Sequence, residues 1–311
     1  MNKQYQLYLC EPRGFCAGVE RAIQIVELAL KKYAPPIYVR HEIVHNRYVV
    51  EDLRQRGVIF VGELSEIPDG GVTIFSAHGI SEKVEGEAKL RELPFIDATC
   101  PLVTKVHVEA QRFEELGREV VLIGHAGHPE VEGTRGRIKG DMLLVGTLDD
   151  VAKLQVKNPD ALAYVTQTTL SVDDTRVMID ALVARFPSII GPDVRDICYA
   201  TQNRQNAVRQ LQGKAELLLV IGSTNSSNSN RLRDLGEEMG MESHLIDDVR
   251  GLNPIWLADK KRIAVTAGAS APEKLVQELV QALQIVNPYE VMPLIYRQEN
   301  VSFKLPKMLV E

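Results

Sequence analysis

Three cysteines divide this chain of 311 residues into stretches of similar length, and that spacing constrains the fold more than any other feature. Cys16 lies in PRGFCAGVERAIQIV, Cys100 in FIDATCPLVTKVHVEA and Cys198 in VRDICYATQNRQNAVRQL. In each case we expect a strand before the cysteine and an amphipathic helix after it. The positive end of a helix dipole favours the thiolate form of a cysteine. Three such thiolates meeting at one point would make a soft metal site.

The segments that follow the cysteines repeat as well. Each helical pattern leads into an apolar strand, PPIYVR, REVVLIG or AELLLVIG, and then into a polar loop, HEIVHN, HAGHPEVEGT or STNSSNSNR. A later strand in each stretch ends in a second polar loop, within VTIFSAHGIS, LAYVTQTTLS and RIAVTAGASAP. Self-similarity of this kind indicates internal repetition, so the sequence predicts three small modules.

These modules are predicted to be of the α/β class. Runs rich in valine and isoleucine without polar alternation are typical of strands buried on both faces of mainly parallel sheets. Loops at the carboxyl ends of such strands commonly bind ligands, so we expect three similar small α/β modules around a pseudo-threefold central cavity. The predicted ranges are 1–98 for the module of Cys16, 99–196 for that of Cys100, 197–284 for that of Cys198, and 285–311 for a C-terminal tail packed on another module.

Composition and charge argue against several classes of protein. A hydrophobic content of 45% with 25% charged residues is typical of globular domains, and the longest apolar runs are too short to cross a bilayer. The net charge of −6 argues against nucleic acid as a partner. The first residues lack the apolar core of a signal peptide, and four cysteines in so long a chain are not a disulfide framework. We therefore expect a protein of the reducing cytoplasm with no membrane partner.

Two patterns are interpreted more simply than they first suggest. Cys10 lies inside the apolar segment QLYLC and is predicted to be structural. The segment HEIVH, from His41 to His45, matches the zinc-protease pattern, which requires both histidines on one face of a helix. Here the segment follows a strand and precedes Asn46, a suitable N-cap for a helix that begins at Arg47. It is therefore predicted to be a loop.

The polar loops of the three modules share neutral or cationic hydrogen-bonding groups. His125 and His128 could bind zinc together with Cys100, but their counterparts in the third module are serine and asparagine, which are poor zinc ligands. Groups of this kind suit an oxyanion such as phosphate, particularly near helix N-termini. No GxxxxGK[ST] loop and no GxGxxG pattern supports a nucleotide. The residues predicted to bind an anion are His45, His78, His128, Ser226, Ser227, Asn228 and Ser270.

Glu130 is the acidic residue nearest to these positions, two residues after His128. It could serve only as a carboxylate at the start of a helix. In a desolvated cavity that holds an anion, the pKa of this carboxyl would be raised and Glu130 would act as a proton donor. Thr168, on the neighbouring loop of the same module, could complete a proton relay.

Together these motifs resemble the LytB family of iron–sulfur enzymes. The resemblance rests on PRGFCAGVERAI, VRHEIVHNRYVV, IFSAHGIS, DATCPLVTKVH, IGHAGHPEVEGT, TQTTLSVDDT, DICYATQNRQ, GSTNSSNSNRL and VTAGASAP, and it covers most of the chain apart from the tail. It implies the reductive dehydroxylation of 4-hydroxy-3-methylbut-2-enyl diphosphate to isopentenyl and dimethylallyl diphosphate. This reaction is the last step of the non-mevalonate isoprenoid pathway.

The resemblance also implies a cofactor, a partner and residue roles. One 4Fe–4S cluster bound by Cys16, Cys100 and Cys198 would leave one iron open to the substrate. An electron donor such as flavodoxin or ferredoxin would be required. Glu130, with Thr168 and His128, would deliver protons. The substrate diphosphate would lie among His45, His78, His128, Thr168, Ser226, Ser227, Asn228 and Ser270.

From the residues alone, other classes of function stay open. An iron–sulfur hydro-lyase could use an open iron on a hydroxylated substrate, and it would need no external electrons. A non-enzymatic iron–sulfur sensor or anion-binding protein would bind a cluster without turnover, although it would have no use for a proton relay. A structural zinc protein would lack an obvious fourth ligand.

Overall fold

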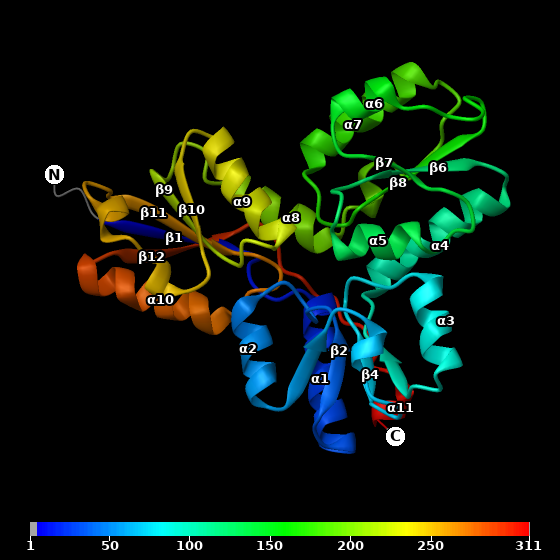
Figure 1. Cartoon of the computed structure of the whole chain (residues 1–311). Coiled ribbons are helices and arrows are strands. Elements are labelled where there is room, and N and C mark those ends of the chain that lie inside the picture. The colour runs from blue at the N-terminus through cyan, green and yellow to red at the C-terminus, as the bar shows by residue number, and fades with distance from the viewer. Residues whose placement is uncertain (1–4, 311) are drawn as a thin grey trace. The chain divides into compact units, whose positions relative to one another are not determined.

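The computed structural model describes residues 5–310, and its strands form three sheets with helices between them. The chain packs into two compact units. Unit 1 comprises the residues up to 19, residues 45–52 and residues 199–302, and unit 2 comprises residues 20–44, 53–198 and those from 303 onward. The α/β class predicted from the sequence is confirmed (Figure 1).

Unit 1 is built on the largest sheet, whose strand order is β10-β9-β11-β1-β12. All its neighbouring strands pair in parallel. Parallel sheets are covered by helices on both faces, which explains why the inner strand β9 is apolar without alternation. The bounds are β1 Gln6–Glu11, β9 Leu217–Ile221, β10 Glu242–Ile246, β11 Arg262–Ala267 and β12 Glu290–Ile295.

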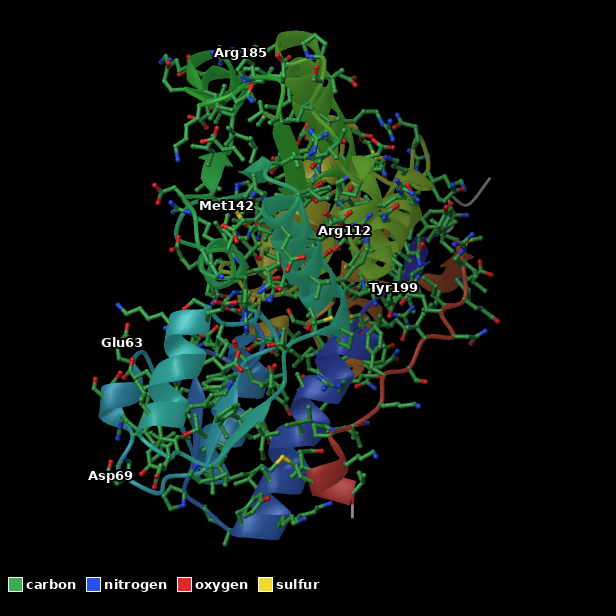
Figure 2. All side chains as sticks on the ribbon, turned by 90° about the vertical axis from the view of Figure 1, so that its right-hand side faces the viewer. Glu63, Asp69, Arg112, Met142, Arg185 and Tyr199 are labelled. Carbon is green, nitrogen blue, oxygen red and sulfur yellow. The ribbon has the colours of Figure 1, made fainter. Side chains whose placement is uncertain are left out.

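Unit 2 contains two smaller parallel sheets, in the orders β3-β2-β4-β5 and β7-β6-β8. Beside the second of these sheets, α7 (Val172–Arg185) is joined to α6 (Leu148–Lys153) by Arg185, which is labelled in Figure 2. Arg185 donates hydrogen bonds to the carbonyl oxygens of Val151 and Leu154 at the end of α6. The strand bounds are β2 Ile37–Arg40, β3 Val58–Val61, β4 Thr73–Phe75, β5 Phe95–Asp97, β6 Glu119–Ile123, β7 Leu143–Val145 and β8 Leu162–Thr166.

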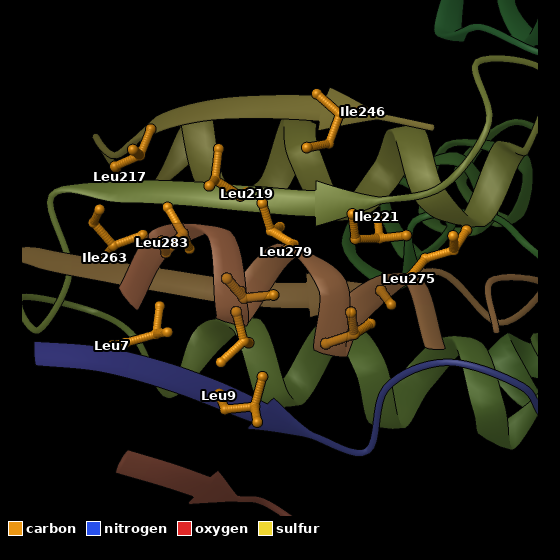
Figure 3. Close-up of a cluster of buried hydrophobic side chains, with 14 of the residues drawn as sticks. Leu7, Leu9, Leu217, Leu219, Ile221, Ile246, Ile263, Leu275, Leu279 and Leu283 are labelled. Atoms are coloured by element: carbon orange, nitrogen blue, oxygen red, sulfur yellow. The ribbon is translucent and has the colours of Figure 1, made fainter. Parts of the chain in front are cut away.

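The core of unit 1 follows the two-residue period of its strands. Leu217 and Leu219 of β9 pack with Leu275 and Leu279 of α10 (Glu273–Val286) (Figure 3). The alternate residues, such as Leu218, pack on the opposite face against α8 (Tyr199–Arg209) and α9 (Ser227–Glu238). This two-sided burial holds the carboxyl ends of the strands, and the loops that follow them, in fixed positions.

The other helices connect strands or follow cysteines. Their bounds are α1 Ala17–Tyr33, α2 Arg47–Gln55, α3 Glu82–Leu90, α4 Pro101–Glu115, α5 Pro129–Arg135 and α11 Lys307–Val310. Short 3-10 helices cover Leu64–Glu66 (η1), Asp193–Asp196 (η2), Val249–Gly251 (η3) and Pro254–Leu257 (η4). Between residues 5 and 310, no helix combines the length and the apolar character needed to span a membrane.

The three sheets repeat one strand order, which supports the predicted three modules. In each, the first strand after a cysteine-linked helix is central, as in β3-β2-β4, β7-β6-β8 and β10-β9-β11. A fourth position beside the third strand is occupied by the segment that leads to a cysteine, β5 before Cys100 and β1 before Cys16. Before Cys198 the expected strand is reduced to one bridge between Ile190 and Ala163. Pro192 follows almost at once and cannot extend a strand ladder.

The predicted module ranges differ from the structure at both ends of the chain. Residues 6–11, assigned to the first module, form β1 in the sheet of β9, β10 and β11, because Leu7 and Leu9 complete the apolar core against α10. The tail predicted over 285–311 is partly a strand, since β12 pairs with β1. Its final segment packs on α1, where the Lys32 ammonium donates to the carbonyl oxygen of Met308 at 2.5 Å.

Candidate functional site

Each of the three spaced cysteines immediately precedes a helix, and its backbone is tied to a polar loop. The Cys100 N–H donates to the Ala77 carbonyl at 3.0 Å, and the Cys198 N–H donates to the Thr168 carbonyl at 3.0 Å. In unit 1, the Cys16 N–H donates to the Ala269 carbonyl at 3.1 Å. Ala77 and Ala269 stand directly before His78 and Ser270. Each cysteine is therefore held beside the second polar loop that the sequence repeat identified.

The burial of the cysteines separates one of them from the other three. Cys10 is fully buried in β1, and this burial raises the pKa of its thiol to about 12. Such a thiol is an inert structural group, as predicted. Cys16, Cys100 and Cys198 are half-buried, and no disulfide joins any of the four cysteines, all of which lie in the described part of the chain.

Glu130 and Thr168 form a buried pair in unit 2. The Thr168 N–H donates to Glu130 Oε1 at 2.6 Å, and the Thr168 hydroxyl donates to Glu130 Oε2 at 3.0 Å. The two side chains are only 3% and 4% exposed. Burial raises the pKa of Glu130 to about 7, although the two bonds from Thr168 oppose this shift. A carboxyl of this pKa can carry a proton near neutral pH and release it.

Two histidines predicted for the site lie next to this carboxyl. His128 is the N-cap of α5, where its Nδ1 accepts the Glu130 N–H at 3.1 Å. Neutral His128 therefore carries its proton on Nε2 and can donate it to a ligand. Its ring lies edge-on to that of His78, with 5.8 Å between the centroids. His78 Nδ1 lies 3.2 Å from the Ser76 hydroxyl, which fixes the orientation of its ring.

A second layer of charged groups lies behind Glu130 and was missed by the sequence analysis. Asp196 is buried, accepts the Thr166 N–H at 3.4 Å and pairs with Lys105 at 3.1 Å. Its charge further raises the pKa of Glu130. The pKa of Glu109 is also raised, first by burial and then by Asp196. The only available signal was the position of Asp196, two residues before Cys198 in RDIC.

The HEIVH segment is a loop, as predicted, and only its last residue, His45, lies in unit 1, where Asn46 caps α2 through the Val49 N–H at 3.1 Å. This loop is tied to the third module. The Ser270 hydroxyl donates to the His45 carbonyl at 2.8 Å, and His45 Nδ1 lies 3.4 Å from the Asn225 amide nitrogen. His45, Ser270 and the serine-rich loop before α9 therefore lie together.

Buried polar side chains lie at the start of α9. Ser226 is its N-cap and accepts hydrogen bonds from the Ser229 N–H at 3.3 Å and the Ser229 hydroxyl at 3.0 Å. Both lone pairs of the Ser226 oxygen are thus occupied, which leaves its proton to donate. Asn228 is 4% exposed, and neither its amide nitrogen nor its amide oxygen has a hydrogen-bond partner in the described chain. Orphaned buried groups of this kind indicate a ligand contact.

Ser229 is a further residue that sequence reasoning missed. It fits only because two backbone positions beside it have no side chain: a Cβ at Gly222 or Gly268 would lie 2.2 or 1.9 Å from its hydroxyl oxygen. Both glycines directly follow strand ends, β9 and β11. The pair of glycines therefore lets Ser229 reach and orient Ser226.

The predicted residues form two sets, one in each unit. Unit 2 brings together His78, His128, Glu130 and Thr168 with the segments of Cys100 and Cys198, and unit 1 brings together Cys16, His45, Ser226, Ser227, Asn228 and Ser270. Within residues 5–310, no three His, Cys, Asp or Glu side chains are grouped closely enough to hold a metal ion. The donor chemistry nonetheless fits the groups expected: half-buried thiols at helix starts suit soft metal, and the orphaned Asn228 amide suits an oxyanion.

These features define a three-sheet α/β protein with half-buried thiols before three helices, a buried carboxyl of raised pKa and a buried amide without a partner among the described residues. The model of the LytB protein family matches residues 7–284. The chain belongs to this family. The match includes all three spaced cysteines and every predicted site residue, and it leaves out the tail from residue 285 onward.

Relatives match nearly the whole chain. A protein of Bradyrhizobium diazoefficiens named 4-hydroxy-3-methylbut-2-enyl diphosphate reductase 2 is 58% identical, over 98% of this chain and 99% of its own length. A reductase of the same name from Escherichia coli O139:H28 is also 58% identical, over 98% and 97% of the two chains. The solved structure of E-1-hydroxy-2-methyl-but-2-enyl-4-diphosphate reductase from Plasmodium falciparum is 41% identical, with a TM-score of 0.95 over 99% of this chain and 97% of that one.

Proposed function

We propose that this chain is a cytoplasmic reductase that converts 4-hydroxy-3-methylbut-2-enyl diphosphate into isopentenyl and dimethylallyl diphosphate, the last step of the non-mevalonate pathway. Relatives that carry this name at 58% identity support the proposal. The overall change consumes two electrons and two protons, breaks the allylic C–O bond and releases water. The observation that carries the proposal is the buried Glu130–Thr168 pair, because loss of a hydroxyl as water requires a proton at that oxygen.

The cofactor of this proposal is one 4Fe–4S cluster held by Cys16, Cys100 and Cys198. When bound, it would supply the two electrons and a Lewis-acidic iron with an open position. A low-potential carrier such as flavodoxin or ferredoxin would deliver the electrons. The thiol positions support this ligand set, since each stands at the start of a helix and beside a polar loop.

The side chains of the protein bind the substrate and move protons. Ser226 and Asn228 at the start of α9 donate to the diphosphate, helped by the helix N-terminus. His45 and Ser270 lie beside them in unit 1, and the proposal also assigns to the diphosphate His78 and His128, whose rings lie edge-on to each other in unit 2. Glu130 holds a proton near neutral pH and gives it to the leaving hydroxyl, while the Thr168 hydroxyl, which donates to Glu130 Oε2, orients the carboxyl.

The proposal is tested by turnover of 4-hydroxy-3-methylbut-2-enyl diphosphate with anaerobically purified protein, with and without a low-potential reductant, after iron and sulfide are counted. We expect about four irons per chain and formation of both five-carbon diphosphates only when reductant is present. Cluster without reductive turnover would point instead to a hydro-lyase or a sensor. Zinc in place of iron would overturn the proposal.

A further inference from the structure

A cation follows each spaced cysteine on the helix that the cysteine begins. Arg21 stands five residues after Cys16, Lys105 five after Cys100, and Arg204 six after Cys198. Surface cations on helices commonly interact with carboxylates of their own helix. These three instead reach across to the chain that precedes another cysteine.

Arg21 on α1 holds the segment before Cys100. Its Nη1 donates to the carbonyl oxygens of Ala98 at 3.3 Å and Thr99 at 3.1 Å. Its Nε donates at 2.8 Å to the carbonyl oxygen of Lys304, in the C-terminal segment. The two residues directly before Cys100 are thus bound to the helix that Cys16 begins.

Lys105 on α4 holds the segment before Cys198 in the same way. Its ammonium donates to the Arg195 carbonyl at 3.3 Å and to the Asp196 carboxylate at 3.1 Å. This contact is partly exposed, because Lys105 retains 48% of its side-chain exposure. It therefore restrains its segment less tightly than the other two contacts do.

Arg204 on α8 holds the segment before Cys16. It is fully buried, and it donates to the Gly14 carbonyl from Nη2 at 2.7 Å and from Nε at 3.2 Å, and to the Phe15 carbonyl at 3.3 Å. Its Nη1 donates to the Ala200 carbonyl at 2.9 Å and pairs with Glu299 at 3.2 Å. Glu299 comes from the C-terminal segment and also accepts from the Asn203 amide at 2.8 Å.

From these contacts we infer that Arg21, Lys105 and Arg204 are positioning residues that hold the three cysteines in a closed cycle. The helix of Cys16 holds Cys100, the helix of Cys100 holds Cys198, and the helix of Cys198 holds Cys16. The C-terminal segment reinforces two of the three steps, through Lys304 and Glu299. This gives a role to a segment that lies outside the family match. The inference deepens the proposed function, because it takes the cysteines as cluster ligands.

The test measures the alkylation rate of each cysteine in metal-free protein by mass spectrometry of its peptides, with iodoacetamide as the probe. The variants are Arg21→Met, Lys105→Met and the double variant Arg204→Met/Glu299→Met, which leaves no unpaired buried charge. Each half-buried thiol reacts through local opening of its loop. We expect Arg21→Met to accelerate Cys100, Lys105→Met to accelerate Cys198, and the double variant to accelerate Cys16.

At the predicted cysteine, we expect the alkylation rate to increase about tenfold in Arg21→Met and in the double variant, and roughly threefold in Lys105→Met, because hydrogen bonds from a charged donor are removed. The other two cysteines should change by less than about twofold. Lys31→Met on α1 and Arg112→Met on α4 are matched controls, because both side chains are exposed, and we expect no change. Glu299→Gln, which keeps Arg204 in place, is a milder variant that should accelerate Cys16 alone.

The crossed pattern is what separates positioning from a general loss of stability. Acceleration of the cysteine on the same helix as the substitution, equal acceleration of all three, or no acceleration would each overturn the inference. Should the double variant fail to fold, Glu299→Gln and the other two variants still decide the matter. Because no cluster is present in this assay, its outcome is independent of turnover. A wrong assignment of the cofactor and a wrong assignment of these cations are therefore distinguishable.

Discussion

The starts of α5 and α9 occupy the same place in two repeats but have different chemistry. Each helix begins six residues after its strand ends, with a predicted site residue as N-cap: His128 on α5 and Ser226 on α9. Two residues further on stand Glu130 and Asn228, both almost fully buried. Glu130 has both carboxyl oxygens hydrogen-bonded by Thr168, whereas the Asn228 amide has no partner among the described residues. In the proposed function, the first position holds a proton and its counterpart binds the substrate diphosphate.

This comparison shows how one scaffold divides two tasks. A buried carboxyl without a cation beside it takes up a proton, because burial penalises its charge. A buried amide does not titrate and can only form hydrogen bonds. Since the Asn228 amide has no partner among the described residues, a bound group can provide one. Under the proposed function, glutamate at this helical position in one repeat delivers protons, and asparagine at the same position in another repeat binds the anion.

We expect the greatest loss of turnover from a substitution of Glu130 on α5. Glu130→Gln keeps the shape of the side chain but removes its proton. We expect turnover to fall by about 10²–10⁴, the usual contribution of a general acid, while the visible spectrum of the cluster stays unchanged. Anaerobic steady-state kinetics with a low-potential reductant measure this. Near-normal turnover would remove Glu130 from the mechanism.

The second prediction concerns pH and the same carboxyl. Because the pKa of Glu130 is raised from 4.5 to about 7 on folding, the native state binds more protons than the unfolded state between these values. The contribution of Glu130 to stability is therefore complete below about pH 4.5 and is lost as the pH rises through 7. Denaturant titrations of the metal-free protein should show this loss, of about 3 kcal/mol. Glu130→Gln should flatten that part of the profile, and an unchanged profile would contradict the assigned pKa.

The third prediction concerns Asn228 on α9 and the KM for substrate. Asn228→Leu replaces an unpartnered amide by an apolar side chain of similar size. Because no hydrogen bond within the protein is lost, we expect the free energy of unfolding to stay constant or rise slightly. The KM for substrate should increase about 10-fold to 100-fold, since the lost contact is to a charged group. An unchanged KM would show that Asn228 does not touch the substrate.

We expect a weaker effect on turnover from a substitution of Thr168, the hydrogen-bond partner of Glu130. Thr168→Val keeps the backbone N–H bond to Glu130 but removes the hydroxyl, which holds the pKa of that carboxyl down. We expect the loss of activity that accompanies deprotonation of Glu130 to move to higher pH. Turnover should fall about tenfold, less than for Glu130→Gln. Thr169→Val, on the next residue, is the control. Equal effects of both substitutions would mean that the loop is merely perturbed.

Much of the site could be predicted from the sequence because it repeats. The cysteines, the polar loops and the parallel strands recur at matching distances, and local pattern carries that information. Counting residues from the cysteine gives the same pair as the helix starts do, because His128 lies 28 residues after Cys100 and Ser226 lies 28 residues after Cys198, and both are N-caps.

Other features depended on contacts that no local pattern encodes. The place of β1 between β11 and β12 joins segments from opposite ends of the chain. The pair of Asp196 with Lys105 and the pair of Arg204 with Glu299 each join residues about ninety positions apart or more. A single sequence shows charges at these positions but not which of them meet, because pairing over such distances is set by the packed sheets.

The position of β1 also orders events during synthesis. β1 leaves the ribosome long before either of its partner strands, which are both encoded after residue 261. The sheets of unit 2 use only strands made before residue 167, so they can assemble while the rest of the chain is still being translated. Cys16, the earliest of the three spaced cysteines to be made, is therefore the last to be fixed in place. If the three cysteines bind a cluster as proposed, its loading must wait until β11 and β12 have been made.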